Sequence, residues 1–296
     1  MIVVVCGATA SSKSSLAQEI ATFLNAKILN ADAYQVYSDL KIGVNKPCEE
    51  IIRKYNYQLI DFLPLDTPFS IADFQRLARR IIDAEIEKGN NLVIEGGSGL
   101  YIRALMFDYE FSDRNSNVIQ NDYERMDSYS LYERLFKLDP DSALKTHQNN
   151  RKRVIRALQI LDENGQTKTE IERQQRHTTI YNNVLYIALN PAREELYSKI
   201  NIRVNEMWAK GLKDEVMSII RTYNPRLQSL QAIGYKEVIN GITANLSDAD
   251  IIELIKKNTR NYAKRQMTFF RHQLPVVFFD DKLQAINFVR EEYNRG

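Results

Sequence analysis

Lys13 and Ser14 are the residues whose types and spacing most clearly predict chemistry. They end the stretch GATASSKS, residues 7–14, which matches the phosphate-binding pattern GxxxxGK[ST] at every fixed position but one. In such a loop, backbone N–H groups converge on an anion, the lysine neutralises it, and the hydroxyl can reach a phosphate-bound Mg²⁺. The predicted phosphate-binding residues are Gly7, Ala8, Thr9, Ala10, Ser11, Ser12, Lys13 and Ser14, with Ser14 as the magnesium ligand.

Ser12 is the departure from the pattern, because it stands where the second glycine is usual. Two interpretations are open. A Cβ at this position could crowd the phosphate, since glycine is normally used where the backbone approaches a ligand closely. Alternatively, serine is common at helix N-termini, and its hydroxyl could add a hydrogen bond there.

Asp32 is the second candidate, in the segment NADAYQVY directly after a short apolar run. In an open parallel sheet, ligands bind beyond the carboxyl ends of the strands, so Asp32 should share a crevice with the phosphate loop. It could act as a general base, or it could cap its own turn or bind Mg²⁺. Gln35 carries an amide that could read a base edge through two hydrogen bonds.

The elements that must position these residues alternate between strands and helices. β-Branched or apolar runs predict strands, and runs with helical spacing predict helices, of which one is capped by Ser70 and another by Ser247. This order predicts an α/β fold of the P-loop NTPase type, a parallel sheet flanked by helices. The expected strands cover residues 2–6, 26–30, 57–61, 91–95, 184–190 and 275–280.

A second glycine-rich turn, Gly96-Gly97-Ser98-Gly99, follows the strand expected at 91–95. Such turns also serve as plain connectors, but its place at a strand's carboxyl end predicts that Ser98 faces the same crevice.

Strand signals disappear in the middle of the chain, where polar and helical sequence dominates. We expect a helical insertion domain at 111–183, within a core made of 1–110 and 184–296. At the start of one insertion helix, Arg151, Lys152, Arg153 and Arg156 oppose the helix dipole. They could bind a polyanion or form a solvated basic face.

The helix that Ser247 caps ends in TRNYAKRQMTFFRHQ, where basic residues are interleaved with aromatic ones. This pattern is typical of a surface that follows a nucleic-acid backbone. Arg203 lies on another helix, and nothing in the local sequence separates it from an ordinary surface arginine.

Composition excludes several classes of protein. The 296 residues are 44% apolar, enough for a sizeable core, and the net charge of +2 says nothing about partners. Cys6 and Cys48 lack metal-site spacing and are expected to be free thiols. There is no apolar run of 18 residues and no signal peptide, so we expect a cytoplasmic protein without a membrane span.

The chain resembles the tRNA dimethylallyltransferase family. The resemblance rests on seven blocks in order, which span most of the core: GATASSKS, DAYQVY with IGVNKP, FSIADF, GGSGLYIRAL, NRKRVIRAL, AIGYKE and AKRQMTFFR. It implies transfer of a dimethylallyl group from dimethylallyl diphosphate to the exocyclic amine of the tRNA adenosine at position 37, next to the anticodon. It also implies Mg²⁺, release of diphosphate, and a monomeric enzyme.

The resemblance also assigns roles to residues. The loop would hold diphosphate and not ATP, Arg203 would clamp its far side, Asp32 would be the base, and Ser98 would bind near the reacting amine. Gln35 would hold the flipped adenine. The positions implied to contact tRNA are Asp32, Ala33, Tyr34, Gln35, Ser98, Lys152, Arg153, Val154, Ile155, Arg156, Gln231, Ala232, Ile233, Gly234, Tyr235, Lys236, Lys264, Arg265, Gln266, Met267, Thr268, Phe269, Phe270 and Arg271.

Three departures from the family pattern fall at one crevice, namely Ala8, Ser12 and Ala33. They leave open a catalytically impaired tRNA-binding homologue. A small-molecule kinase would share the phosphate loop but would not explain the basic helix that ends near Arg271. Preference for ATP over dimethylallyl diphosphate would favour the kinase.

Overall fold

The computed structural model describes residues 1–109, 111, 120–174 and 178–295. The chain divides into two compact units, which are described separately: Met1–Met106 with Tyr181–Gly296, and Phe107–Ile180. The boundaries expected from the sequence lay a few residues further along, at 110/111 and 183/184.

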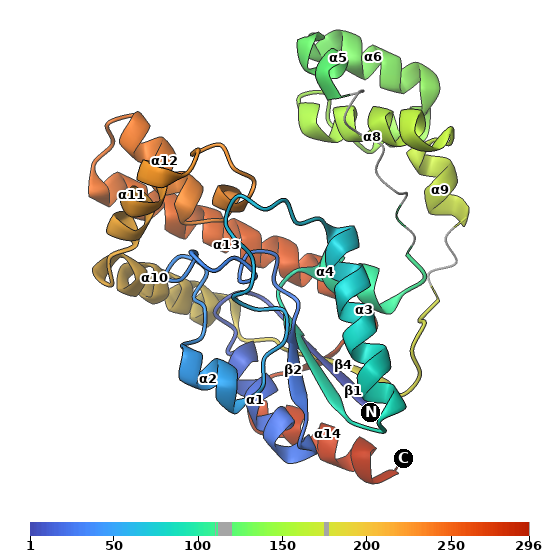
Figure 1. The fold of residues 1–296 in the computed structure, drawn as a ribbon, viewed down its shortest axis with the longest axis vertical. Helices are drawn as coiled ribbons and strands as arrows, with labels where there is room; N and C mark the ends of the chain where they lie inside the picture. Colours follow the sequence, from blue (N-terminus) through green and yellow to red (C-terminus); the bar gives the residue numbers. More distant parts are fainter. Residues whose placement is uncertain (110, 112–119, 175–177, 296) are drawn as a thin grey trace. The chain divides into compact units, whose positions relative to one another are not determined.

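The first unit is built on one parallel sheet with the strand order β2-β3-β1-β4-β5 (Figure 1). Strand β1 lies at its centre and is buried along its whole length, as its β-branched sequence IVVVC predicts. The fold class expected from the sequence is therefore confirmed. The strands are β1 (Ile2–Cys6), β2 (Lys27–Asn30), β3 (Leu92–Gly96), β4 (Val184–Leu189) and β5 (Val277–Phe279).

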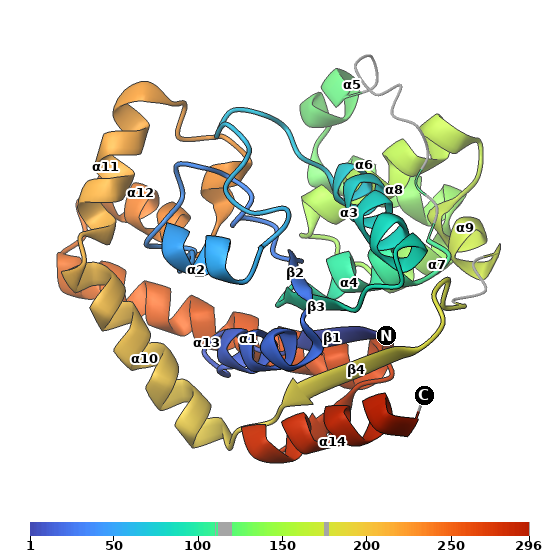
Figure 2. The same ribbon diagram turned by 60° about the horizontal axis from the view of Figure 1, so that its bottom comes forward.

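Helix α1 (Lys13–Leu24) packs its apolar side on the sheet together with α14 (Lys282–Arg295), and Figure 2 shows α14 below β4. Their shared core includes Leu16, Ile20 and Val289. On α3 (Ile71–Glu87), Ser70 and Asp73 form the expected capping box. Gln75 of α3 donates to the carbonyl of Ala104 in α4 (Gly99–Met106) at 2.6 Å, which joins these two helices.

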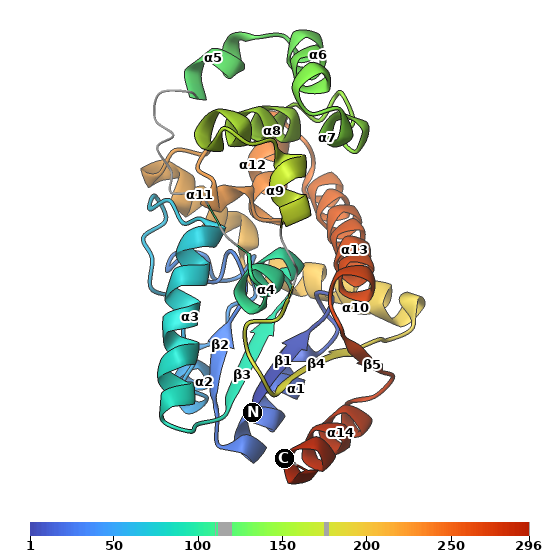
Figure 3. The same cartoon turned by 90° about the vertical axis from the view of Figure 1, so that its right-hand side faces the viewer.

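The C-terminal part of this unit contributes a group of helices beside the sheet (Figure 3). The longest, α13, begins after its expected cap Ser247, whose hydroxyl accepts the N–H of Asp250. It packs against α10, α12 and α4. The remaining helices of the unit are α2 (Glu49–Lys54), α10 (Arg193–Ala209), α11 (Leu212–Thr222), the 3-10 turn η1 (Ser229–Gln231), α12 (Tyr235–Thr243) and α13 (Asp248–Gln273).

The strand expected at 57–61 is wrong. Only Gln58 forms a bridge, with Leu29 of β2. Leu59 and Asp61 adopt left-handed backbone angles, with φ of 56° and 55°, and such angles interrupt a strand. The segment therefore runs beside the sheet as a loop.

In the residues described, the second unit is built of helices, as expected, and a single antiparallel bridge joins Phe107 to Thr179 at its two ends. A core of its own joins α6 to α8 through residues such as Leu131, Leu135 and Leu158. Helix α9 ends at Gln174, and residues 175–177 lie outside the described part of the chain. The helices are α5 (Gln120–Arg125), α6 (Ser128–Leu138), α7 (Pro140–Leu144), α8 (Arg151–Asn164) and α9 (Lys168–Gln174).

Both cysteines are free thiols, as expected. Among the described residues, no helix is long and apolar enough to cross a membrane.

Candidate active site

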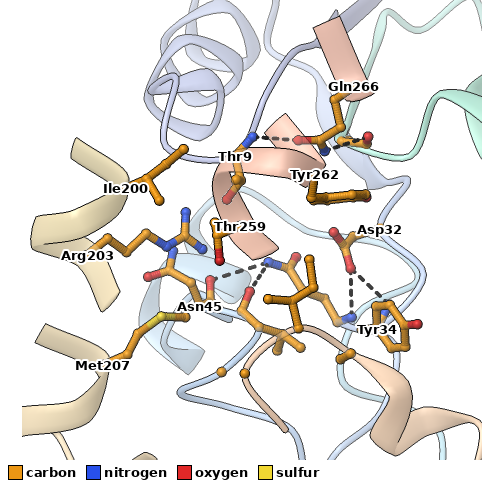
Figure 4. A pocket seen from close by; sticks show the side chains of 18 of the residues that line it. Thr9, Asp32, Tyr34, Asn45, Ile200, Arg203, Met207, Thr259, Tyr262 and Gln266 are labelled. Atoms are coloured by element: carbon orange, nitrogen blue, oxygen red, sulfur yellow. Dashed lines mark hydrogen bonds between the residues drawn. The ribbon is translucent and has the colours of Figure 1, made fainter. Parts of the chain in front are cut away.

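A cavity of about 290 Å³ lies at the carboxyl ends of β1, β2 and β3 in the first unit. Loops that follow these strands form one side, and α10, α13 and the start of α12 form the other (Figure 4). It brings together predicted residues that are far apart in the sequence. Those lining the cavity are Thr9, Lys13, Ser14, Asp32, Tyr34, Gln35, Arg203, Gln231, Ala232, Ile233, Gly234, Lys236, Arg265 and Gln266.

The phosphate loop has non-glycine residues at two positions whose backbone conformation favours glycine. Ser12 has a φ of 66° and Ala10 a φ of 64°, both in the left-handed region that disfavours a Cβ. The Ser12 side chain makes no capping hydrogen bond to helix α1. Ser12 therefore stands at the N-cap of α1 without capping the helix, and a hydrogen bond from its hydroxyl to a bound phosphate stays a prediction. Ala10 and Ser12 both hold an unfavourable backbone conformation.

Lys13 and Arg203 place two cationic groups at the same cavity. Loss of contact with water lowers the pKa of Lys13, and Arg203 lowers it further, whereas Glu95 and Asp32 act in the opposite direction. Desolvation also lowers the pKa of Arg203, against the opposing effect of Asp32. Two desolvated cations facing one space favour an anionic ligand with more than one charge.

Arg203 reaches the cavity because α10 turns that face inward. Its neighbours on this face, Ile200 and Met207, line the same space (Figure 4). No local signal marks this arginine, since only the packing of α10 on α13 decides which side of the helix faces the cavity.

Glu95 is a site residue that our reasoning from the sequence missed. Its buried carboxylate accepts the hydroxyl of Ser14 at 2.5 Å and the hydroxyl of Tyr57 at 2.7 Å. Burial and the Glu95 charge raise the pKa of Tyr57, so this phenol stays protonated and can donate. A signal was present, because a glutamate ends the otherwise apolar run NLVIE directly before the glycine-rich turn.

Asp32 both caps its turn and faces the cavity. Its Oδ1 accepts the backbone N–H groups of Tyr34 at 2.9 Å and Gln35 at 3.2 Å. Within the described residues, no hydrogen bond is formed by Oδ2. Capping therefore fixes one oxygen in place and leaves the other to act on a ligand (Figure 4).

Gln35 is already engaged. Its amide nitrogen donates to the carbonyls of Val44 at 3.1 Å and Asn45 at 3.3 Å. Because its amide nitrogen is occupied, Gln35 has only its amide oxygen available to a base. In this conformation it cannot form the two hydrogen bonds to a base edge that were expected. Gln35 instead holds the loop at 43–45, which lines the cavity.

Ser98 is not among the residues that line the cavity, although Gly96 and Gly97 are. Its carbonyl accepts the N–H of Ile102 in the first turn of α4. The structure thus brings the second glycine-rich turn to the cavity, but not the Ser98 hydroxyl.

Tyr235 is the residue of the block at 231–236 that does not line the cavity, and its side chain is fully buried. Its hydroxyl accepts the N–H of Gly43 at 3.2 Å and donates to Glu215. A Cβ on Gly43 would lie 2.3 Å from the Tyr235 ring, so only glycine fits there. Tyr235 therefore holds a loop of the cavity and offers no surface to tRNA.

Only one side of α13 is open to a partner. Lys264, Arg265, Thr268 and Arg271 are exposed, whereas Phe270 is fully buried. Met267 and Phe269 are partly covered, and Gln266 is 5% exposed. Of the block at 264–271, the exposed face carries the positive charge.

In the second unit, α8 exposes Lys152 and Arg153, while Val154 is buried and Ile155 half-buried. Arg156 pairs with Glu163 at 3.1 Å. The basic cluster at the helix start is thus partly neutralised, because Arg156 is exposed but paired. Among the described residues, Lys152 and Arg153 are exposed and form no ion pair.

The strand order and the phosphate loop after the central strand define a P-loop-like α/β protein. A family model described as IPP transferase matches residues 35–273. A tRNA dimethylallyltransferase from Anoxybacillus flavithermus is 41% identical over 280 residues, covering 94% of this chain and 90% of that protein. The Bacillus subtilis tRNA dimethylallyltransferase is 37% identical over 284 residues, with the same coverage.

Solved structures agree with these relatives. The crystal structure of a tRNA delta(2)-isopentenylpyrophosphate transferase from Staphylococcus epidermidis is 32% identical, with a TM-score of 0.73 over 99% of this chain and 98% of that one. The chain belongs to the IPP transferase family.

Proposed function

We propose that this protein transfers the dimethylallyl group of dimethylallyl diphosphate to the exocyclic amine of the tRNA adenosine next to the anticodon, at position 37. The observation that carries the proposal is one cavity holding Lys13, Arg203 and Asp32. Two cations suit a diphosphate, and a carboxylate with an unpaired oxygen suits the removal of a proton from an amine.

Departure of diphosphate is the step of the reaction that depends most on electrostatic stabilisation. The carbon–oxygen bond of the allylic diphosphate breaks as the nitrogen–carbon bond forms, and negative charge accumulates on the leaving group. Lys13, Arg203 and the N–H groups at the start of α1 would stabilise that charge. Apolar side chains of α10 and α13, among them Ile200, Val204 and Ile255, line the same cavity and would keep water from the allylic carbon.

Mg²⁺ fits the oxygen donors at this end of the cavity. The Ser14 hydroxyl and the Glu95 carboxylate already lie together, and Mg²⁺ prefers such ligands. In the part of the chain that the structure describes, no group of three or more His, Cys, Asp or Glu side chains could hold a metal, so Mg²⁺ would also need substrate oxygens and water. When bound, it would neutralise charge on the diphosphate.

The exocyclic amine of adenine is a weak nucleophile, because its lone pair is delocalised into the ring. Asp32 would accept the amine proton at Oδ2 while Oδ1 keeps its turn in place. The adenine must leave its stack to enter the cavity, as in other enzymes that modify bases. The exposed residues Lys264, Arg265, Arg271, Lys152 and Arg153 would bind the RNA backbone. We expect a monomer acting in the cytoplasm, where tRNA is found, and light scattering checks the oligomeric state.

Transfer of labelled dimethylallyl to unmodified tRNA in the presence of Mg²⁺ tests the proposal. Asp32→Asn keeps the turn cap but weakens the base, so kcat should fall by roughly 10²–10⁴-fold while the Kd for tRNA changes less than about twofold. Asp66→Asn, at an exposed position that is not among the residues lining the cavity, is the matched control and should be fully active. Equal loss of activity and tRNA affinity would contradict the assignment of Asp32.

A catalytically impaired tRNA-binding homologue is the second candidate. The left-handed angles of Ala10 and Ser12 favour it, because they occur in the loop that must receive the diphosphate. Binding of tRNA without transfer by the unmodified protein would establish this alternative.

A further inference from the structure

Gln266 connects the two glycine-rich loops of the cavity. Its Oε1 accepts the N–H of Thr9 in the phosphate loop at 2.9 Å, and its Nε2 donates to the carbonyl of Gly97 at 2.8 Å (Figure 4). The side chain is 5% exposed. Both hydrogen bonds join segments more than 160 residues apart in the sequence. Gln266 was expected to contact tRNA, but its amide faces the protein.

The second loop is shaped to receive α13. A Cβ on Gly97 would lie 2.4 Å from Nε2 of Gln266, and a Cβ on Gly99 would lie 2.2 Å from the Phe269 ring. These two glycines therefore allow one turn of α13 to lie directly on the loop. Close packing of this kind fixes the Gln266 side chain in a single position.

We propose that Gln266 is a positioning residue for diphosphate binding, which sets the phosphate loop at a fixed place relative to the second glycine-rich turn. The inference deepens the proposed function and rests on it for the identity of the anion. It concerns binding of the diphosphate alone, so it can be tested without any transfer of the allyl group.

An amide suits this position because it is both an acceptor and a donor on one planar group. A carboxylate would lack the donor for Gly97, and an apolar side chain would lack both groups. The phosphate loop needs such support, since Ala10 and Ser12 hold unfavourable backbone angles within it. Without the Thr9 hydrogen bond, the loop N–H groups that face the anion would no longer be held in advance.

Gln266→Met is the principal variant, because methionine keeps the length and most of the volume of glutamine. Binding of inorganic diphosphate with Mg²⁺, measured by calorimetry, should weaken by about tenfold on loss of the two hydrogen bonds. The KM for dimethylallyl diphosphate should rise in parallel, while the Kd for tRNA should change less than twofold. Gln284→Met, an exposed position on α14, is the matched control and should bind diphosphate normally.

Gly97→Ala provides an independent test. Its methyl group should push the Gln266 amide away and weaken diphosphate binding to a similar extent. In a Gln266→Ala background the space is free, so adding Gly97→Ala should change the affinity less than twofold. This non-additivity is expected only if both changes act through the same contact.

Three outcomes would overturn the proposal. Weaker tRNA binding with unchanged diphosphate binding would make Gln266 an RNA contact. Additive effects of Gly97→Ala and Gln266→Ala would mean that the two residues act separately. A lower melting temperature with unchanged diphosphate affinity in the folded protein would mean that Gln266 serves packing alone. If no transfer occurs but the diphosphate results are as expected, the proposed function fails and this inference stands.

Discussion

At the scale of single residues, the site combines favourable charges with a costly backbone. A left-handed non-glycine residue costs roughly 1 kcal/mol, and the phosphate loop contains two, Ala10 and Ser12. Gly7, which opens the loop at a φ of 146°, is the glycine that the pattern requires at the first position. The loop thus holds two left-handed backbone positions without a glycine at either.

Ser12→Gly should relieve part of this cost. Glycine accepts a φ of 66° without strain, but it also increases the conformational entropy of the unfolded chain, so we expect a gain in stability of about 0–1 kcal/mol. Thermal unfolding measures this change, and calorimetry should show diphosphate affinity unchanged or higher. A tenfold loss of affinity would show instead that the exposed Ser12 hydroxyl is a ligand.

At the scale of elements, the loop at 42–45 that lines the cavity is held in place by hydrogen bonds to α11 and α12. Glu215 of α11 accepts the N–H of Ile42 at 3.0 Å, and Tyr235 at the start of α12 accepts that of Gly43. The next residues of that loop, Val44 and Asn45, line the cavity and accept hydrogen bonds from Gln35. Side chains of α11 and α12 that lie behind this loop therefore determine one wall of the site.

Tyr235→Phe tests this support. Loss of the hydroxyl leaves the Gly43 N–H without its acceptor, so unfolding should become easier by about 1–2 kcal/mol. Because the loop would move, KM for dimethylallyl diphosphate should rise as well. Tyr223→Phe removes an exposed hydroxyl that bonds Asp39 at 3.3 Å and should change neither quantity. A selective loss of tRNA affinity without a change in stability would restore Tyr235 as an RNA contact.

Prediction from the sequence succeeded where the signal is local. The strand, loop and helix around Lys13 and the helix caps at Ser70 and Ser247 each follow from a few adjacent residues. Local reasoning failed for contacts between distant segments. The partners of Gln266 lie in two loops that are 257 and 169 residues away in the sequence, so its hydrogen bonds could not be inferred from helix periodicity.

At the scale of the whole molecule, the phosphate site and part of the expected RNA-binding surface belong to different units. The second unit has its own core, centred on residues such as Leu131 and Leu158. The cavity is lined entirely by residues of the first unit. Charge changes on the surface of the second unit should therefore leave diphosphate binding intact.

The double variant Lys152→Glu/Arg153→Glu tests the RNA-binding role of α8. The logarithm of the association constant for tRNA falls as the logarithm of the salt concentration rises. Each lost phosphate contact should make that slope less steep by about 0.7–0.9, so tRNA binding should weaken and become less sensitive to salt. Affinity for Mg²⁺ and inorganic diphosphate should stay the same. Lys137→Glu/Lys145→Glu makes the same charge change at exposed positions of this unit and should have a smaller effect. Equal effects of the two pairs would indicate a general field instead of a specific contact.

The central position of β1 in the sheet also has a consequence for folding during synthesis. Ile2 pairs with Leu92 on one side and with Val184 on the other, so β1 has neither neighbour until the chain has been synthesised well beyond it. At about 5–20 residues per second, the ribosome needs roughly 9–36 s to extend the chain from Ile2 to Val184. During that time the uncharged β-branched segment IVVVC is the kind of sequence that aggregates. Strand β1, which carries the phosphate loop, is thus synthesised well before both of its partners, and we expect chaperones to protect it during that interval.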